Sequence, residues 1–153
     1  MLHIPAPLEC VTDGLTVFLA GGISDTADWQ AQVVAQLAEL RFTLFNPRRV
    51  EFPEGDERES ERQIEWEWRH LQRADLVAFW FPPETMCPVA LFELGACSAA
   101  DVPLVVGTHP DYCRRFDVVQ QLKLRRPEVE VHCSLDAVVD DIKHFVTWAT
   151  SQR

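Results

Sequence analysis

The stretch Leu76-Val-Ala-Phe-Trp-Phe81 decides the fold class, and Pro88-Val-Ala-Leu-Phe-Glu93-Leu-Gly95 follows it within a few residues. The first stretch is too apolar to face water on either side, which is typical of a strand in a parallel sheet covered on both faces. The second predicts a helix that begins near Pro88 and ends by Asp101, because proline is favoured in the first helical turn. Glu93 then lies in an apolar helical segment, where a desolvated charge is costly. This carboxylate needs either a buried partner or a chemical task.

The same alternation of apolar strand and helix continues along the chain. Further strands are expected over residues 15–20, 42–45, 103–107 and 129–132, and further helices over 28–40, 61–73, 114–124 and 135–149. Apolar strands that alternate with helices predict a parallel sheet. We therefore expect an α/β flavodoxin-like three-layer sandwich, with a five-stranded parallel sheet of order 2-1-3-4-5 and helices on both faces. It forms one domain over residues 1–153, with its core at about 15–150.

Charge and composition narrow the class of partner. The net charge of -10, from 24 acidic and 14 basic residues, repels nucleic-acid phosphates and anionic membranes, so small molecules are favoured. No apolar run reaches the length of a spanning helix and no signal peptide is recognisable, which predicts a cytoplasmic protein. The five cysteines are scattered without a CxxC pair, and the histidines lack the spacing of metal ligands. We therefore expect neither a metal nor another cofactor. The polar stretch Glu51–Glu61 is expected to be a solvated loop.

Ligands of such sheets bind beyond the carboxyl ends of the strands, where strand order reverses. Gly21-Gly22 and the loop from Pro82 to Pro88 would meet there, and Gly21-Gly22 allows close approach of the backbone to a ligand. Asn46-Pro47-Arg48-Arg49 follows the second strand, and its guanidinium groups can hold a phosphate or a carboxylate. The alternative is an exposed, solubilising arginine pair. Asp75, at the opposite end of its strand, is expected to be a structural cap.

A second carboxylate, Glu67, borders the apolar face that we expect Ile64, Trp68 and Leu71 to form on the helix over 61–73. Two carboxylates that converge on one pocket can divide the work of glycosidic chemistry, at roughly 5 Å in retaining enzymes. The alternatives are a surface position for Glu67, paired with an arginine of its own helix, and burial of Glu93 against an arginine such as Arg48. In either case the start of its helix would favour ionised Glu93.

Aromatic side chains cluster around the same segments. They are Trp66, Trp68, Phe79, Trp80 and Phe81. Most aromatic residues of this kind belong to a core, but any that line the crevice offer a stacking face to a planar base.

A series of short stretches in a fixed order adds a resemblance. They are Val17-Phe-Leu-Ala-Gly-Gly-Ile-Ser24 with Trp29, Asn46-Pro-Arg-Arg49, Gln63-Ile-Glu-Trp-Glu67, Ala74-Asp75, Phe79-Trp-Phe81, Pro88-Val-Ala-Leu-Phe-Glu-Leu-Gly95 and Arg115-Phe-Asp-Val118. Together they resemble the nucleoside 2-deoxyribosyltransferase-like family over about residues 15–120. The ordered set is specific, although no single stretch is.

The resemblance implies cleavage of the N-glycosidic bond of a nucleoside or nucleotide, with transfer to another base or to water. Glu93 falls on the family's glutamate nucleophile, and Glu67 falls on the carboxylate that manages the proton of the base. Phe18 stands where characterised members have a tyrosine, and Cys87 lies near the position that meets the 5′ end of the sugar. A homodimer or a larger homo-oligomer is implied as well.

These arguments predict a set of substrate-binding residues. The set is Gly21, Gly22, Ile23, Asn46, Arg48, Arg49, Trp66, Phe81, Cys87 and Pro88. Three alternatives stay open: a nucleotide-specific N-glycosidase that holds a 5′-phosphate with Arg48 or Arg49, a non-catalytic nucleotide-binding module, and a flavin carrier.

Overall fold

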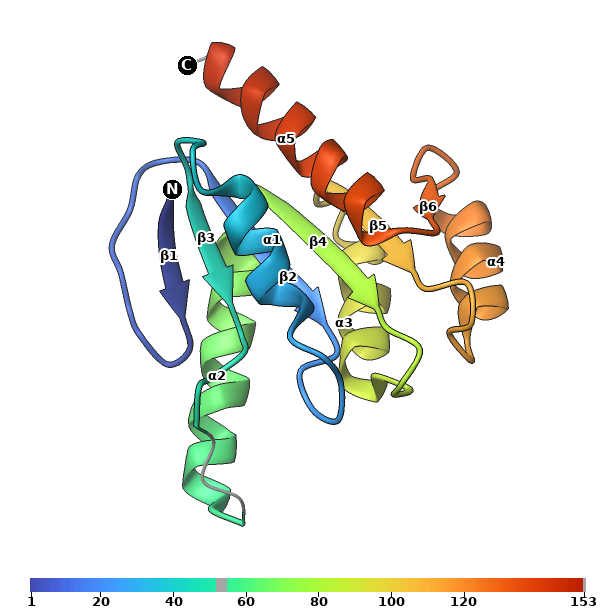
Figure 1. Ribbon diagram of the computed structural model, residues 1–153, viewed down its shortest axis with the longest axis horizontal. Coiled ribbons are helices and arrows are strands. Elements are labelled where there is room, and N and C mark those ends of the chain that lie inside the picture. Colours follow the sequence, from blue (N-terminus) through green and yellow to red (C-terminus); the bar gives the residue numbers. More distant parts are fainter. Residues whose placement is uncertain (52–54, 153) are drawn as a thin grey trace.

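The computed structural model describes residues 1–51 and 55–152 and has three layers, with a parallel sheet between two layers of helices (Figure 1). In the described part, the strands are β1 (Leu2–Pro5), β2 (Thr16–Gly21), β3 (Thr43–Asn46), β4 (Leu76–Phe81), β5 (Leu104–Thr108) and β6 (Val131–His132). The helices are α1 (Trp29–Leu37), α2 (Glu57–Arg73), α3 (Pro88–Ala99), α4 (Arg115–Arg125) and α5 (Leu135–Ser151). The predicted α/β sandwich with helices on both faces is therefore confirmed.

The prediction of a five-stranded sheet is wrong. The sheet has six strands in the order β1-β3-β2-β4-β5-β6, and every pair is parallel. The strand that was missed is β1, which pairs with the outer side of β3 from Leu2 to Pro5. Only Ile4 in this short strand is buried, and Pro5 is tolerated because the strand lies at an edge. The segment therefore lacks the apolar run that marks the inner strands.

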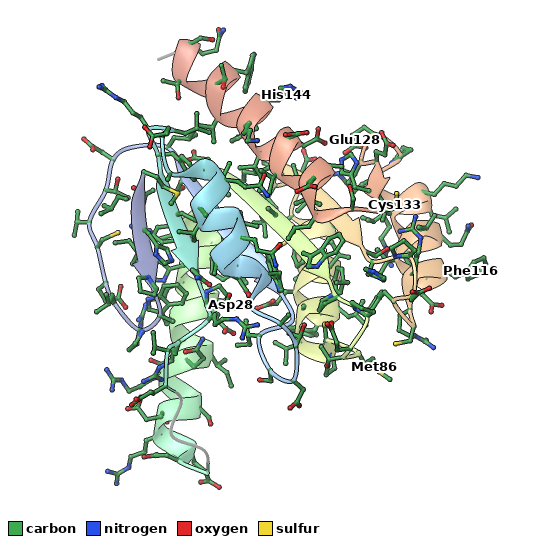
Figure 2. All side chains as sticks on the ribbon, in the orientation of Figure 1. Asp28, Met86, Phe116, Glu128, Cys133 and His144 are labelled. Carbon is green, nitrogen blue, oxygen red and sulfur yellow. The ribbon has the colours of Figure 1, made fainter. Side chains whose placement is uncertain are left out.

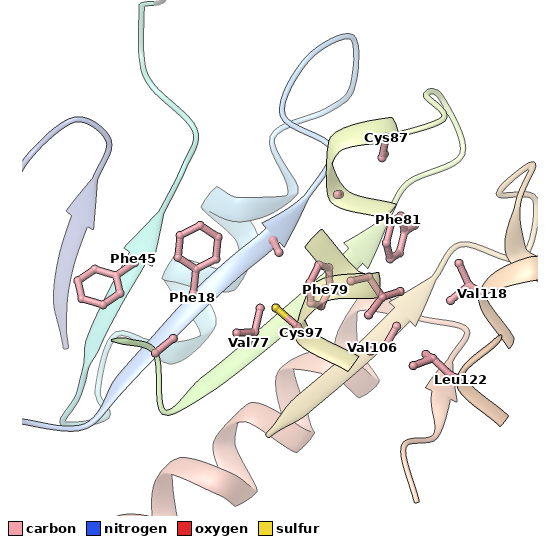
Figure 3. Close-up of a cluster of buried hydrophobic side chains, with 14 of the residues drawn as sticks. Phe18, Phe45, Val77, Phe79, Phe81, Cys87, Cys97, Val106, Val118 and Leu122 are labelled. Atoms are coloured by element: carbon pink, nitrogen blue, oxygen red, sulfur yellow. The ribbon is translucent and has the colours of Figure 1, made fainter. Parts of the chain in front are cut away.

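Two hydrophobic clusters hold the layers together. Phe18, Phe79 and Phe81 point to one face of the sheet and pack against α2, α3 and α4 (Figure 3). Leu19 and Trp80 point to the other face and pack with α1 and α5. Consecutive residues of β2 and β4 are thus buried on opposite faces, which explains their unbroken apolar sequences. No helix in the described residues is long and apolar enough to cross a membrane.

Helix α2 departs from the prediction at its start and in its buried face. It begins at Glu57, where the Asp56 side chain accepts hydrogen bonds from two backbone N–H groups. The expected loop over Glu51–Glu61 is therefore wrong from Glu57 onward, and residues 52–54 lie outside the described part. The first turn is acidic, which suits the positive end of the helix dipole.

The face of α2 that meets the sheet is more polar than its sequence pattern predicts. Its buried residues are Gln63, Trp66, Glu67 and His70. Ile64 and Trp68, expected on the apolar face, are each 63% exposed. The polar groups are held by specific bonds: the Trp66 indole donates to the Leu8 carbonyl, and the His70 ring bonds to the Trp66 carbonyl. Burial of polar groups costs little when they are hydrogen-bonded, so the helix can turn this face inward.

The two central strands approach each other most closely where β2 ends. Gly21 has a φ of 145°, and a Cβ atom there would lie 2.0 Å from the Trp80 carbonyl oxygen. Only glycine fits such a conformation and such an approach. At the other end of these strands, the Asp75 carboxylate accepts hydrogen bonds from the backbone and hydroxyl of Thr16. This is the capping role that the sequence predicts for Asp75.

Gly21→Ala should lower the free energy of unfolding by about 2 kcal/mol or more, because it combines a backbone clash with an unfavourable φ. Gly95→Ala is the matched control. Gly95 lies inside α3, and a Cβ atom there would have no neighbour within 4 Å, so alanine should add about 1 kcal/mol of stability. Urea unfolding followed by circular dichroism measures both changes. Equal stability of the Gly21→Ala variant and the wild type would contradict the constraint at Gly21.

Candidate active site

A cavity of about 540 Å³ opens beyond the carboxyl ends of β2 and β3, against the inner sides of α2 and α3. Its lining comprises Phe18, Ala20, Gly21, Ile23, Ser24, Pro47, Arg48, Arg49, Gly55, Ser60, Gln63, Ile64, Glu67, Val89, Ala90 and Glu93. β2 pairs with β3 on one side and with β4 on the other, so the cavity lies where the strand order reverses. Both candidate carboxylates, Glu67 and Glu93, line this same cavity.

Glu67 lies on α2 and is only 9% exposed. One of its carboxylate oxygens accepts a hydrogen bond of 2.7 Å from the Gln63 carboxamide nitrogen, one turn earlier on the helix. The same nitrogen donates to the Pro47 carbonyl at 2.8 Å, which ties α2 to the segment after β3. Burial raises the pKa of Glu67, and the bond from Gln63 opposes that shift because it stabilises the ionised form. Glu67 is therefore a buried carboxylate and not a surface acid.

Glu93 lies in the second turn of α3 and is half-buried at the cavity. Within residues 1–51 and 55–152, no hydrogen-bond donor reaches its carboxylate. Burial raises the pKa of Glu93 to about 8, and the nearby charge of Glu67 adds to the increase. Desolvation and the second carboxylate thus oppose the effect of the start of α3, which favours the ionised form of Glu93.

The two carboxylates differ in their hydrogen-bond partners. Glu67 accepts a hydrogen bond from Gln63, whereas Glu93 has no such donor in the described part of the chain and feels the Glu67 charge. Two like charges close together in a poorly solvated cavity resist ionising at the same time. Such a pair favours a state with one carboxylate and one carboxylic acid, which is the complement that a nucleophile and a general acid require.

Arg48 and Arg49 border the cavity but have other partners. Arg48 donates to the Gln30 side-chain oxygen at 2.8 Å and to the Ala27 carbonyl, and lies 3.4 Å from Asp28, at the start of α1 (Figure 2). Arg49 forms an ion pair of 2.9 Å with Glu59. The alternative in which Arg48 neutralises a buried Glu93 is therefore wrong, and neither arginine is a mere solubilising group.

Other residues of the predicted site divide into two groups. Gly21 and Ile23 line the cavity. Gly22, Asn46, Trp66, Phe81, Cys87 and Pro88 lie outside its lining. Their placement has physical reasons, since the Gly22 carbonyl accepts hydrogen bonds from Trp29 and Gln30, and the Asn46 oxygen caps the backbone of Arg48.

The aromatic candidates lie in the core. Trp66 is 1% exposed and stacks on His70 at 4.1 Å between ring centroids, while Phe81 is fully buried beside Tyr112. Neither ring presents a free face to a base in this conformation. Cys87 is buried at the start of α3 in the left-handed conformation, and Pro88 begins the helix with its side chain in solvent.

Sequence reasoning missed the cavity residues that flank the carboxylates, above all Gln63. The sequence spacing could have indicated Gln63, because this residue precedes Glu67 by one helical turn and so lies on the same helix face. Ser24 and Ser60 add hydroxyl groups to the lining, and Val89 and Ala90 supply apolar wall. In the described part of the chain, no three His, Cys, Asp or Glu side chains are grouped as metal ligands would be.

A parallel three-layer α/β fold with two interacting carboxylates beyond the strand ends defines a class of protein suited to acid and nucleophile chemistry on a small molecule. Comparison with known families narrows this class. The family model for "nucleoside 2-deoxyribosyltransferase like" proteins matches residues 14–112, which is more than half of the chain. The chain therefore belongs to the nucleoside 2-deoxyribosyltransferase-like family, as its sequence motifs indicate.

Structural comparison gives a fold relative. The crystal structure of a conserved protein from Enterococcus faecalis V583 matches with a TM-score of 0.63 over 85% of this chain and 98% of that one. The two sequences are 17% identical, so this similarity concerns the fold. No curated protein sequence matches the chain.

Glu93→Gln should stabilise the ligand-free protein more strongly at pH 8 than at pH 5. The folded protein holds Glu93 with a pKa of about 8, whereas the unfolded chain ionises it near 4.5. The wild type thus loses stability as pH rises between these values, and the variant has no such group. The difference in unfolding free energy should grow by on the order of 3 kcal/mol across this window, as measured by urea unfolding.

Gly95→Ala, which removes no titratable group, is the control, and its effect should stay constant across the same pH range. A Glu93→Gln effect that is equally independent of pH would contradict the raised pKa of Glu93.

Proposed function

We propose that this protein cleaves the N-glycosidic bond of a nucleoside, with Glu93 as the nucleophile and Glu67 as the general acid. Membership of the nucleoside 2-deoxyribosyltransferase-like family indicates glycosyl transfer involving nucleosides. The observation that carries the specific assignment is that Glu67 and Glu93 line one cavity and that the charge of Glu67 raises the pKa of Glu93. Carboxylates that influence each other in this way suit a double displacement at a sugar carbon.

The first step forms a bond between the Glu93 carboxylate and C1′ of the sugar while the bond from C1′ to the base nitrogen breaks. The bonding electron pair leaves with the base, and Glu67 supplies the proton that the base takes up. The proposal places one shared proton on the pair, and the raised pKa of Glu93 favours that residue as its holder in the ligand-free protein, so the proton passes to Glu67 as the substrate binds. A base that accepts a hydrogen bond from Glu67 favours this transfer.

The second step releases the sugar from Glu93. A water molecule or a second base attacks C1′, and Glu67, now ionised, takes the proton that the attacking group loses. The carboxylate of Glu93 departs from C1′ and the original proton count of the pair is restored. Ile23, Val89 and Ala90 add apolar surface to the cavity in which the intermediate would form.

Glu93→Ala should abolish the release of free base from a nucleoside panel, and Glu67→Gln should slow it by about 10²–10⁴-fold, the usual contribution of a general acid. Chromatography of the free base measures both rates. Glu65→Gln is the matched control, since Glu65 lies on the same helix and faces solvent, and it should leave the rate unchanged. Unimpaired base release by the Glu93→Ala variant would refute the assignment of the nucleophile.

The wild-type kcat/KM should fall as pH rises above about 8, by about tenfold per pH unit, because the carboxylate pair then loses its last proton. No acid remains for the departing base. Initial rates between pH 5 and 10 measure the profile, with circular dichroism at each pH to show that the protein stays folded. A kcat/KM that stays constant from pH 7 to 10 would contradict the role of the shared proton.

A nucleotide-specific N-glycosidase is the second candidate, because Arg48 and Arg49 line the cavity. Both guanidinium groups already have acidic partners, Asp28 and Glu59, so a 5′-phosphate must share them. Comparing kcat/KM for a nucleoside and its 5′-monophosphate separates the two activities. A non-catalytic binding module is recognised by ligand binding without release of base.

The proposal includes a homodimer or a larger assembly. Large apolar side chains are exposed on α3 and on α4: Val89 is 60% exposed, Phe92 79% and Phe116 75%. Phe116 points away from the body of the protein, and Met86 is exposed near the start of α3 (Figure 2). Light scattering in solution measures the mass of the assembly.

A further inference from the structure

The carboxamide oxygen of Gln63 is a buried acceptor without a partner. Gln63 is 6% exposed and lines the cavity, yet no donor in the described part of the chain reaches this oxygen. A buried polar atom that has lost its bonds to water without replacement costs about 1–3 kcal/mol. Folded proteins keep few such atoms, and those at a ligand cavity point to a bond that the ligand completes.

The orientation of this carboxamide is determined by its neighbours. Its nitrogen lies 2.8 Å from the Pro47 carbonyl oxygen, which can only accept a hydrogen bond. Exchanging nitrogen and oxygen would place two acceptors against each other at this distance. The nitrogen also lies 2.7 Å from Glu67. Gln63 therefore presents an acceptor, and not a donor, as its unused group.

Glu67 provides the complementary group one helical turn away. Gln63 occupies one of its carboxylate oxygens, and the proposed mechanism places the transferable proton on Glu67 when the base departs. The cavity wall then carries a donor at Glu67 and an acceptor at Gln63, adjacent on the same face of α2. A matching base offers a ring acceptor next to an N–H donor.

We propose that Gln63 selects 6-aminopurines over 6-oxopurines, by accepting a hydrogen bond from the exocyclic amino group while Glu67 bonds to the neighbouring ring nitrogen. This inference rests on the proposed function, because it takes the base to be the group that meets Glu67. Adenine presents an N7 acceptor beside the N6 amino donor, whereas guanine and other 6-oxopurines present two acceptors. An oxo group would face the Gln63 oxygen with no hydrogen atom between them.

The burial of the Gln63 oxygen increases the discrimination between 6-aminopurines and 6-oxopurines. Within the described part of the chain this buried oxygen accepts no hydrogen bond, so an amino group that binds it displaces no hydrogen bond from the protein. A site that leaves a buried polar group unpaired with the wrong ligand discriminates more strongly than an apolar pocket.

The test is calorimetric binding of two free bases, adenine and hypoxanthine, which requires no turnover. The wild type should bind adenine about tenfold more tightly or better, and Gln63→Leu should bring the two affinities within about twofold. Gln63→Met serves as a second variant of similar length if the leucine variant does not fold. Gln72→Leu is the matched control on the same helix, because Gln72 faces solvent, and it should keep the wild-type preference.

A structural role for Gln63 would weaken binding of both bases equally and leave their ratio unchanged, and that result would overturn the proposal. Equal affinity of the wild type for both bases, or binding of neither, would overturn it as well. Preferential adenine binding without base release from any nucleoside supports selection by Gln63 and refutes the proposed catalysis. Base release from nucleosides without preferential binding of adenine would support the proposed catalysis and overturn selection by Gln63.

Discussion

The parallel pairing of β2 with β4 is the constraint on which the rest of the structure depends. It runs from Val17 opposite Leu76 to Gly21 opposite Trp80. At Gly21, where the pairing ends, a side chain would collide with the Trp80 backbone. Because both strands are buried on both faces, they fix the positions of helices in each outer layer. The end of β2 forms the floor of the cavity, and α3, which begins soon after β4, brings Glu93 to its wall.

The second requirement of the site is that α2 turns a polar face inward. Gln63 connects the carbonyl of Pro47 to the carboxylate of Glu67, so the segment after β3, the helix and the proposed acid are held as one unit. Further along the helix, His70 lies between Trp66 and Phe45, and its ring bonds to the Trp66 carbonyl. These contacts locate Glu67 through only one of its carboxylate oxygens. In the part of the chain that the structure describes, the other oxygen accepts no hydrogen bond and can meet a ligand.

The sequence was sufficient for the fold class and for the expectation that Glu67 and Glu93 converge on one pocket, since both line the same cavity, but not for the details of α2. Continuous apolar strands predicted the parallel sheet, and an acid within an apolar helix singled out Glu93. The face of α2 was mispredicted because Ile64 and Trp68 form a convincing apolar pair, while the true buried face derives its stability from hydrogen bonds. Such bonds depend on partners distant in sequence, such as Leu8 and Pro47, which no local pattern reveals. β1 escaped detection for the same reason, since only its pairing with β3 makes it a strand.

The arrangement of charge around the cavity shows why these carboxylates differ from ordinary buried acids. Two arginines border the same space, and either one, placed against Glu93, would lower the pKa of that carboxyl and make the site a structural ion pair. The fold instead holds Arg48 against Gln30 and Asp28, and Arg49 against Glu59. Glu93 has a pKa of about 8 because burial desolvates its carboxyl group and the charge of Glu67 lies nearby. In the proposed reaction, a substrate that takes up the proton of the carboxylate pair relieves the cost of this desolvation. The desolvation that weakens the free protein therefore favours the proposed chemistry.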